Sequence, residues 1–156
     1  MAYQSRIQYV LQKGEPVVDV IFYTGDRLPQ YYTNSVIYDL PFGYRANACN
    51  FAMLKNQAKM IDGKLSFGGK QSFALLTLPD QTEMNYETLK RVSELVKAGL
   101  VVWGAKPVEM LSLTDIKYKT AEFEQLADAL WGESDETRYG KGRVICGKPI
   151  GDALHE

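Results

Sequence analysis

The chain has 156 residues, of which 46% are hydrophobic and 24% charged, a composition typical of one globular domain with a buried core. Its 18 basic and 19 acidic side chains nearly cancel, and no cluster of lysine or arginine stands out. This balance argues against a nucleic-acid partner, whose affinity for a protein depends on concentrated positive charge. No stretch approaches the roughly 20 apolar residues of a membrane span, and no signal peptide is visible, so we expect no membrane partner.

The sequence has few of the cysteine and histidine residues that commonly form metal sites and catalytic dyads. Its two cysteines, Cys49 and Cys146, fit neither a disulfide framework nor a CxxC metal site. Its single histidine, His155, lies beside the C-terminus. The glycine-rich fingerprints of nucleotide-binding sites are also absent. We therefore expect no metal, no cofactor and no catalytic residue in this chain.

Taken in chain order, the first half predicts a helix, a strand, a long loop and a second helix. Residues 5–13 place apolar side chains on one helical face, and Gly14 follows them as a stop. Residues 17–24 form a nearly continuous apolar run, which is typical of a strand covered on both faces. Residues 25–43 predict a long loop rich in tyrosine, and residues 47–54 predict a short helix.

The second half predicts a hairpin followed by alternating strands and helices. Asp62-Gly63 suits a type I′ hairpin turn, because both central residues of that turn need a positive φ. The remaining expected elements are a strand at 72–78, a helix at 85–98 closed by Gly99, a strand at 100–103, a helix at 120–131 with Thr120 as its N-cap, a polar turn region at 132–142 and a strand at 143–146.

This alternation predicts βαβ units and therefore a parallel sheet. We expect a three-layer α/β fold with a mostly parallel sheet and an inserted β-hairpin. Residues 151–156 read as the first turn of a helix that does not continue. We therefore expect residues 1–156 to be a single domain excised from a longer protein.

Candidate contact residues follow the ends of the expected strands, where open α/β sheets bind their ligands. Gly25 and Asp26 follow the first strand, Pro79-Asp80 follows the second, and residues 104–107 follow the third. A purely structural interpretation, in which these glycines and prolines only turn the chain, stays open. The tyrosine-rich loop at 25–43 has three interpretations as well: packing against a neighbouring domain, contact with a sugar, or no specific role.

Two catalytic chemistries would each need particular residues at these positions. A cysteine hydrolase needs a thiolate on a sharp strand-to-helix turn and a nearby histidine base. The turn that corresponds here, Trp103-Gly104-Ala105, has no nucleophile. Glycoside hydrolysis needs two carboxylates facing each other across a sugar, and nothing in the sequence brings two together. The available carboxylates are Asp19, Asp26, Asp39, Asp80 and Glu83.

Several segments, in order, resemble one family. Residues 6–14 and 18–26 resemble the stretch that follows the catalytic barrel in α-L-rhamnosidases of glycoside hydrolase family 106. Gly43-Tyr44, followed by residues 50–54, resembles that family's Gly-Tyr-Asp segment and its asparagine-containing helix. The Asp62-Gly63 hairpin, residues 76–80 and residues 139–144 follow in the expected order.

The resemblance implies a flavodoxin-like domain similar to class I glutamine amidotransferases but without their catalytic triad. It implies a non-catalytic accessory domain that packs against the catalytic barrel of a glycoside hydrolase acting on a rhamnose-containing glycan, with a parent that is periplasmic or exported. The candidate ligand or interdomain contacts are then Gly25, Asp26, Tyr44, Asn47 and Asn50. The family tends to carry acidic residues where this chain has Arg45 and Asn47, so no substrate contact is carried over there.

Two alternatives remain beside this interpretation. One is a small cysteine-dependent amidotransferase-like hydrolase that uses Cys49 or Cys146. The other is a sugar-binding module.

Overall fold

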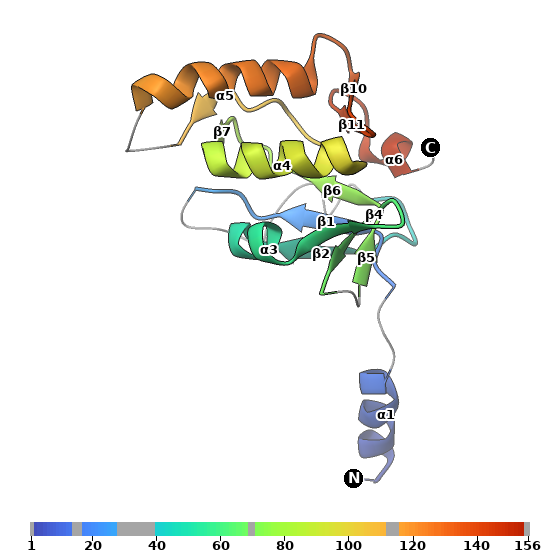
Figure 1. Ribbon diagram of the computed structural model, residues 1–156. Coiled ribbons are helices and arrows are strands. Elements are labelled where there is room, and N and C mark those ends of the chain that lie inside the picture. The colour runs from blue at the N-terminus through green and yellow to red at the C-terminus, as the bar shows by residue number, and fades with distance from the viewer. Residues whose placement is uncertain (1, 14–16, 28–39, 69–70, 112–115, 155–156) are drawn as a thin grey trace.

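The computed structural model describes residues 2–13, 17–27, 40–68, 71–111 and 116–154. Its central feature is a six-stranded sheet with the order β10-β11-β8-β6-β1-β2 (Figure 1). Five of these strands run parallel and the edge strand β10 runs antiparallel to β11, so the expected mixed α/β fold with a mostly parallel sheet is confirmed. The strands are β1 (Val20–Tyr23), β2 (Ala46–Cys49), β6 (Leu75–Thr77), β8 (Val101–Trp103), β10 (Glu136–Tyr139) and β11 (Gly142–Ile145).

Two smaller sheets are also present in the described residues. β3 (Ala58–Ile61), β4 (Lys64–Phe67) and β5 (Gln71–Phe73) form an antiparallel sheet, and β7 (Glu83–Met84) pairs in parallel with β9 (Glu109–Met110). The expected hairpin joins β3 to β4. Asp62 has a φ of 50° and Gly63 a φ of 77°, as a type I′ turn requires.

Helices cover the main sheet and bury its apolar side chains. On one face, Ile21, Leu76 and Val102 share a core with residues of α3 (Phe51–Asn56), α4 (Tyr86–Ala98) and α5 (Ile116–Trp131). On the other face, Val20 and Leu75 pack with Ile150 of α6 (Ile150–Leu154). Burial on both faces explains why the strand sequences read as continuous apolar runs. Among the helices that the structure describes, α1 (Ala2–Lys13) stands apart from the sheets (Figure 1).

The α4 helix matches its sequence-based expectation closely, because its apolar stripe is long and regular. Leu89, Val92 and Val96 are fully buried, as their helical spacing predicts. Gly99 ends the helix with a φ of 125°, and its N–H donates to the carbonyl of Val96.

One expected helix, at 47–54, is wrong in its first half. Residues 46–49 are strand β2, which pairs in parallel with β1, and α3 begins only at Phe51. Asn50 separates the two elements, since its side chain accepts a hydrogen bond from the Met53 N–H at 3.0 Å and caps the helix. β2 lies at the edge of the sheet and three of its four side chains are only half-buried, so it lacks the apolar run that identifies a strand.

Three further boundaries differ from expectation. The strand expected at 72–78 is divided between two sheets at Ala74, whose N–H donates to the Asp19 carbonyl at 2.8 Å. The region expected to be a polar turn contains β10, whose mostly polar, half-exposed residues gave no strand signal. Thr120 is not an N-cap, because α5 starts at Ile116. Gly14 and most of the 25–43 loop lie outside the described residues.

The turn between β10 and β11 packs directly on the C-terminal end of α4, which explains its glycine-rich sequence. The N–H of Arg143 donates to the Leu100 carbonyl at 3.2 Å, and that of Lys141 to the Lys97 carbonyl at 3.1 Å. A Cβ atom at Gly142 would lie 2.2 Å from the Leu100 carbonyl oxygen and 2.4 Å from that of Val96. Only glycine permits this approach of one backbone to another.

We therefore expect Gly142→Ala to lower the free energy of unfolding by about 1–3 kcal/mol, because the clash is with backbone atoms that cannot rotate away. The measurement is the midpoint of urea-induced unfolding. Gly151→Ala is the matched control, since its Cβ would meet only a side-chain carbon of Pro41, at 3.3 Å. Equal midpoints for the two variants would contradict this account of the turn.

Candidate functional site

A cavity of about 480 Å³ opens at the carboxyl ends of β6, β8 and β11. It lies at the edge of the sheet where the parallel strands end, which is where open α/β sheets bind their ligands (the strand-end rule). Its lining comes from three segments, each of which directly follows a strand: Leu78, Pro79 and Asp80; Trp103, Gly104 and Ala105; and Cys146, Gly147, Lys148 and Pro149.

Hydrogen bonds donated by the half-buried Trp103 and the buried Trp131 hold two of these segments in place. The indole N–H of Trp103 donates to the Lys148 carbonyl at 2.8 Å, which fixes the segment after β11 against the end of β8. The indole N–H of Trp131, in α5, donates to the Gly104 carbonyl at 2.9 Å. Both tryptophans thus satisfy their single donor while their rings fill apolar space.

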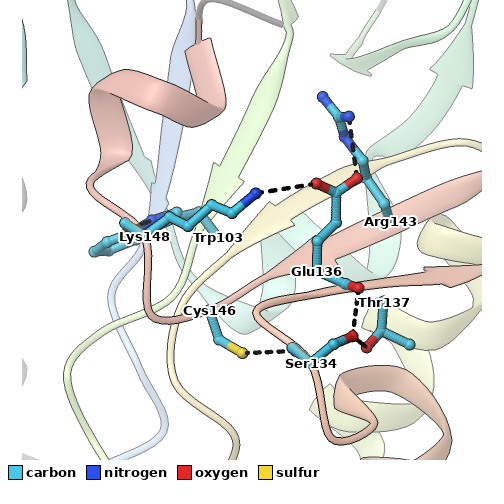
Figure 2. Close-up of polar contacts among 7 residues, drawn as sticks. All are labelled: Trp103, Ser134, Glu136, Thr137, Arg143, Cys146 and Lys148. Atoms are coloured by element: carbon cyan, nitrogen blue, oxygen red, sulfur yellow. Dashed lines mark hydrogen bonds and ion pairs between the residues drawn. The ribbon is translucent and has the colours of Figure 1, made fainter.

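Ion pairs join β10 and β11 to Lys148, which lines the cavity (Figure 2). The carboxylate of Glu136 receives the Arg143 guanidinium at 3.2 Å and the Lys148 ammonium at 3.6 Å, so one anion lies between two cations. Ser134 donates to the Glu136 carbonyl at 2.7 Å, and the Cys146 thiol donates to the Ser134 carbonyl at 3.5 Å. These bonds tie β10 to the segment that lines the cavity.

Asp26, a candidate from the sequence, follows β1, and its side chain joins β1 to α4 through hydrogen bonds. Its carboxylate accepts hydrogen bonds from the Tyr23 hydroxyl at 2.5 Å, the Thr88 hydroxyl at 2.9 Å and the Asn85 N–H at 2.9 Å. The Asn85 side chain makes no capping bond, so Asp26 supplies the acceptor at the start of α4. Burial, followed by the bond to Asp26, raises the pKa of Tyr23, which keeps the phenol protonated as a donor.

The other sequence candidates are spread over both ends of the sheet. Gly25 is buried beside Asp26 with a φ of 88°, and a Cβ there would lie 2.6 Å from the side-chain oxygen of Gln81. Asn50, at the same end, caps α3. Asn47 is within β2 and donates to the Gln71 side chain at 3.4 Å. Tyr44 precedes β2 and donates to the Leu154 carbonyl at 3.5 Å, at the opposite end of the sheet.

The strand-end rule therefore identified two of the three segments that line the cavity. Pro79, Asp80, Gly104 and Ala105 lie in its wall, whereas Gly25 and Asp26 do not. The segment 146–149 was missed, although Gly147 and Pro149 follow the last strand in the same manner as the other turns follow theirs. The same rule applied to the fifth parallel strand would have found it.

Neither thiol is activated as a nucleophile, although Cys146 lines the cavity. Burial raises the pKa of Cys49 to about 12, and that side chain is only 1% exposed. Burial, with a smaller contribution from Asp135, also raises the pKa of Cys146. A catalytic thiol needs the opposite shift, toward the thiolate. Among the described residues that line the cavity, Asp80 is the only carboxylate, so no pair suited to glycoside hydrolysis is assembled there.

Comparison with known proteins shows a consistent relationship. A family model described as alpha-L-rhamnosidase, Glyco_hydro_106, matches residues 1–156. A protein of Formosa agariphila, named as a provisional beta-glucuronidase, is 32% identical over 137 residues, which are 85% of this chain and 11% of that protein. The solved structure of a rhamnosidase from Novosphingobium sp. PP1Y superposes with a TM-score of 0.86 at 28% identity, covering 98% of this chain and 15% of that one. The chain thus spans a small fraction of each relative.

We expect Asp26→Asn to lower the free energy of unfolding by about 1.5–3 kcal/mol, because an amide offers one acceptor fewer to three donors and turns an N–H group toward one of them. Urea-induced unfolding measures this effect. Asp80→Asn, at an exposed position, is the control and should change the stability by less than about 0.5 kcal/mol. If Asp26→Asn unfolds at the same urea concentration as the parent, the structural role of this carboxylate is wrong.

We also expect both thiols to resist modification at pH 7–8, because their raised pKa values leave almost no thiolate. Labelling with a disulfide reagent should be far slower in the native chain than in urea, with Cys49 the slower of the two. Cys146→Ser isolates the signal of Cys49. A native thiol that reacts faster than free cysteine would instead favour the cysteine-dependent hydrolase.

Proposed function

Because the chain belongs to the alpha-L-rhamnosidase family, glycoside hydrolase family 106, we propose that it is a non-catalytic accessory domain of a larger glycoside hydrolase. One observation carries this proposal. The superposition on a solved rhamnosidase includes 98% of this chain, but the matched part is only 15% of that protein. The catalytic barrel then belongs to the remaining part of the longer chain, and its substrate class is a rhamnose-containing glycan.

The chemistry of the cavity supports a scaffold role. Hydrolysis of a glycosidic bond needs a positioned acid and a second carboxylate, roughly 5–10 Å apart. The described lining offers Asp80 alone, and Asp26 is engaged with three internal donors. The lining is also held rigidly by its own hydrogen bonds, which suits a surface that presents a fixed shape to a neighbour.

The strand order supports the finer proposal for the fold. In order of appearance along the chain, the five parallel strands follow the arrangement 2-1-3-4-5, which is the arrangement of flavodoxin-like sheets. We propose that the domain is of this type and similar to class I glutamine amidotransferases. The turn after β8 holds Gly104 where such an enzyme would need a nucleophile, in keeping with a domain that has no triad.

The candidate contact residues divide into two groups under this proposal. Asp26 and Asn50 have internal roles, as a link between β1 and α4 and as a helix cap, and Gly25 is buried beside them. Tyr44 and Asn47 are half-buried at or beside β2, which lies at the edge of the main sheet. We propose these two as the contacts with a neighbouring domain.

A sugar-binding module is the second candidate, because the cavity is large enough for a monosaccharide and is lined by an aromatic ring and a carboxylate, Trp103 and Asp80. A ligand titration separates this candidate from the accessory domain. Titration with L-rhamnose, followed by tryptophan fluorescence, should show no saturable change if the domain only supports a neighbour. A saturable change that disappears in Asp80→Asn would favour the sugar-binding module.

We expect the 156-residue chain to hydrolyse an aryl α-L-rhamnoside no faster than buffer, since no carboxylate pair is assembled in the described cavity. The assay follows release of the aryl group, with Asp80→Asn as the matched variant. Turnover that disappears in Asp80→Asn would place a catalytic carboxylate in this domain and overturn the proposal.

A further inference from the structure

Helix α1 carries an apolar stripe that its own domain leaves in water. Tyr3, Ile7, Val10 and Leu11 follow one another at helical spacing, within an arc of about 100°. Their exposed fractions are 76%, 40%, 68% and 73%. The opposite face carries Ser5, Gln8 and Gln12 together with one aromatic side chain, Tyr9, which is 60% exposed, so that face is mostly polar.

Such a helix needs a partner to persist. An isolated helix of about 12 residues is marginal in water, because few hydrogen bonds offset the cost of its first turn. Every side chain from Tyr3 to Lys13 is exposed, and the helix stands away from the sheets (Figure 1). The described part of the domain therefore supplies no cover for the stripe.

The comparisons indicate where the cover lies. The superposition on the Novosphingobium rhamnosidase includes 98% of this chain, and α1 must therefore fall within the matched part. In that protein the matched part is only 15% of the chain, so most of the polypeptide is available to cover such a helix.

A second copy of the chain is a poorer occupant. Stable interfaces between separate proteins engage roughly 20–30 residues a side, whereas α1 has 12 residues. A surface this small is sufficient within one polypeptide, because the covalent link keeps the effective concentration of the partner high.

The charge of α1 sets the chemistry of its partner surface. The helix has two basic residues, Arg6 and Lys13, and no acidic residue. We propose that the stripe of Tyr3, Ile7, Val10 and Leu11 docks into an apolar groove with a neutral or acidic rim on the catalytic part of a longer chain. This inference rests on the function proposed above and makes α1 the element that joins the two parts.

Hydrogen exchange of residues 2–13 tests the docking, in the 156-residue chain and in the longer polypeptide that contains it. The amides should exchange at least about tenfold more slowly in the longer polypeptide, because docking removes the helix from its freely opening state. The double variant I7Q/L11Q should lose this protection, whereas Q8A/Q12A, on the opposite face, should keep it. In the 156-residue chain, I7Q/L11Q should leave the Tm unchanged, since both side chains are already exposed.

Equal exchange in the two polypeptides, or protection that survives I7Q/L11Q, would overturn the inference. A lower Tm for I7Q/L11Q in the 156-residue chain would show that the stripe packs on its own domain and would also overturn it. Stripe-dependent dimerisation, or sedimentation with anionic phosphatidylglycerol vesicles, would assign a different occupant. Hydrolysis of a rhamnoside by the longer polypeptide checks the proposed function separately. Hydrolysis without protection of α1 contradicts the docking alone, and a longer polypeptide that has no barrel contradicts the proposed function.

Discussion

The carboxylate of Asp26 holds together the two elements around which the rest of the domain is arranged. It receives the hydroxyl of Tyr23 at the end of β1, and the N–H of Asn85 and hydroxyl of Thr88 at the start of α4. Tyr23 and Thr88 are fully buried, so water cannot replace Asp26 as their acceptor without opening the core. α4 is thereby fixed over the strands whose apolar side chains it covers, and the turn after β1 is fixed with it.

The same requirement for satisfied polar groups shapes the cavity edge. The indole N–H groups of Trp103 and Trp131 each donate to a backbone carbonyl of a lining segment. Glu136 lies between Arg143 and Lys148 and links β10 to the last lining segment. These hydrogen bonds and ion pairs join the lining segments to neighbouring strands and to α5.

The surface of the domain has two features that a self-contained protein would be expected to cover. The stripe on α1 exposes four large apolar side chains on one face. β2 lies at the edge of the main sheet with half-buried side chains. Both features agree with a domain that forms a small part of a much longer relative.

The sequence by itself determined those elements whose signals are local. α4 followed from a regular apolar stripe and a closing glycine, and the β3–β4 hairpin followed from Asp62-Gly63, because these patterns depend only on residues a few positions apart. The parallel character of the sheet followed from apolar runs that are covered on both faces. Two of the three segments that line the cavity followed from the ends of those runs.

Only the tertiary structure decided the edge strands, the division at Ala74 and the role of Asp26. β2 and β10 have no apolar run, since an edge strand is paired on one side and half-buried. β2 is identified by its pairing with β1, which lies far earlier in the chain, and β10 by its hairpin pairing with β11. Ala74 bonds to Asp19, which is distant in sequence. Asp26 looked like a ligand contact because it follows a strand, but two of its three donors, the Asn85 N–H and the Thr88 hydroxyl, lie about 60 residues away at the start of α4, where no local pattern reveals them.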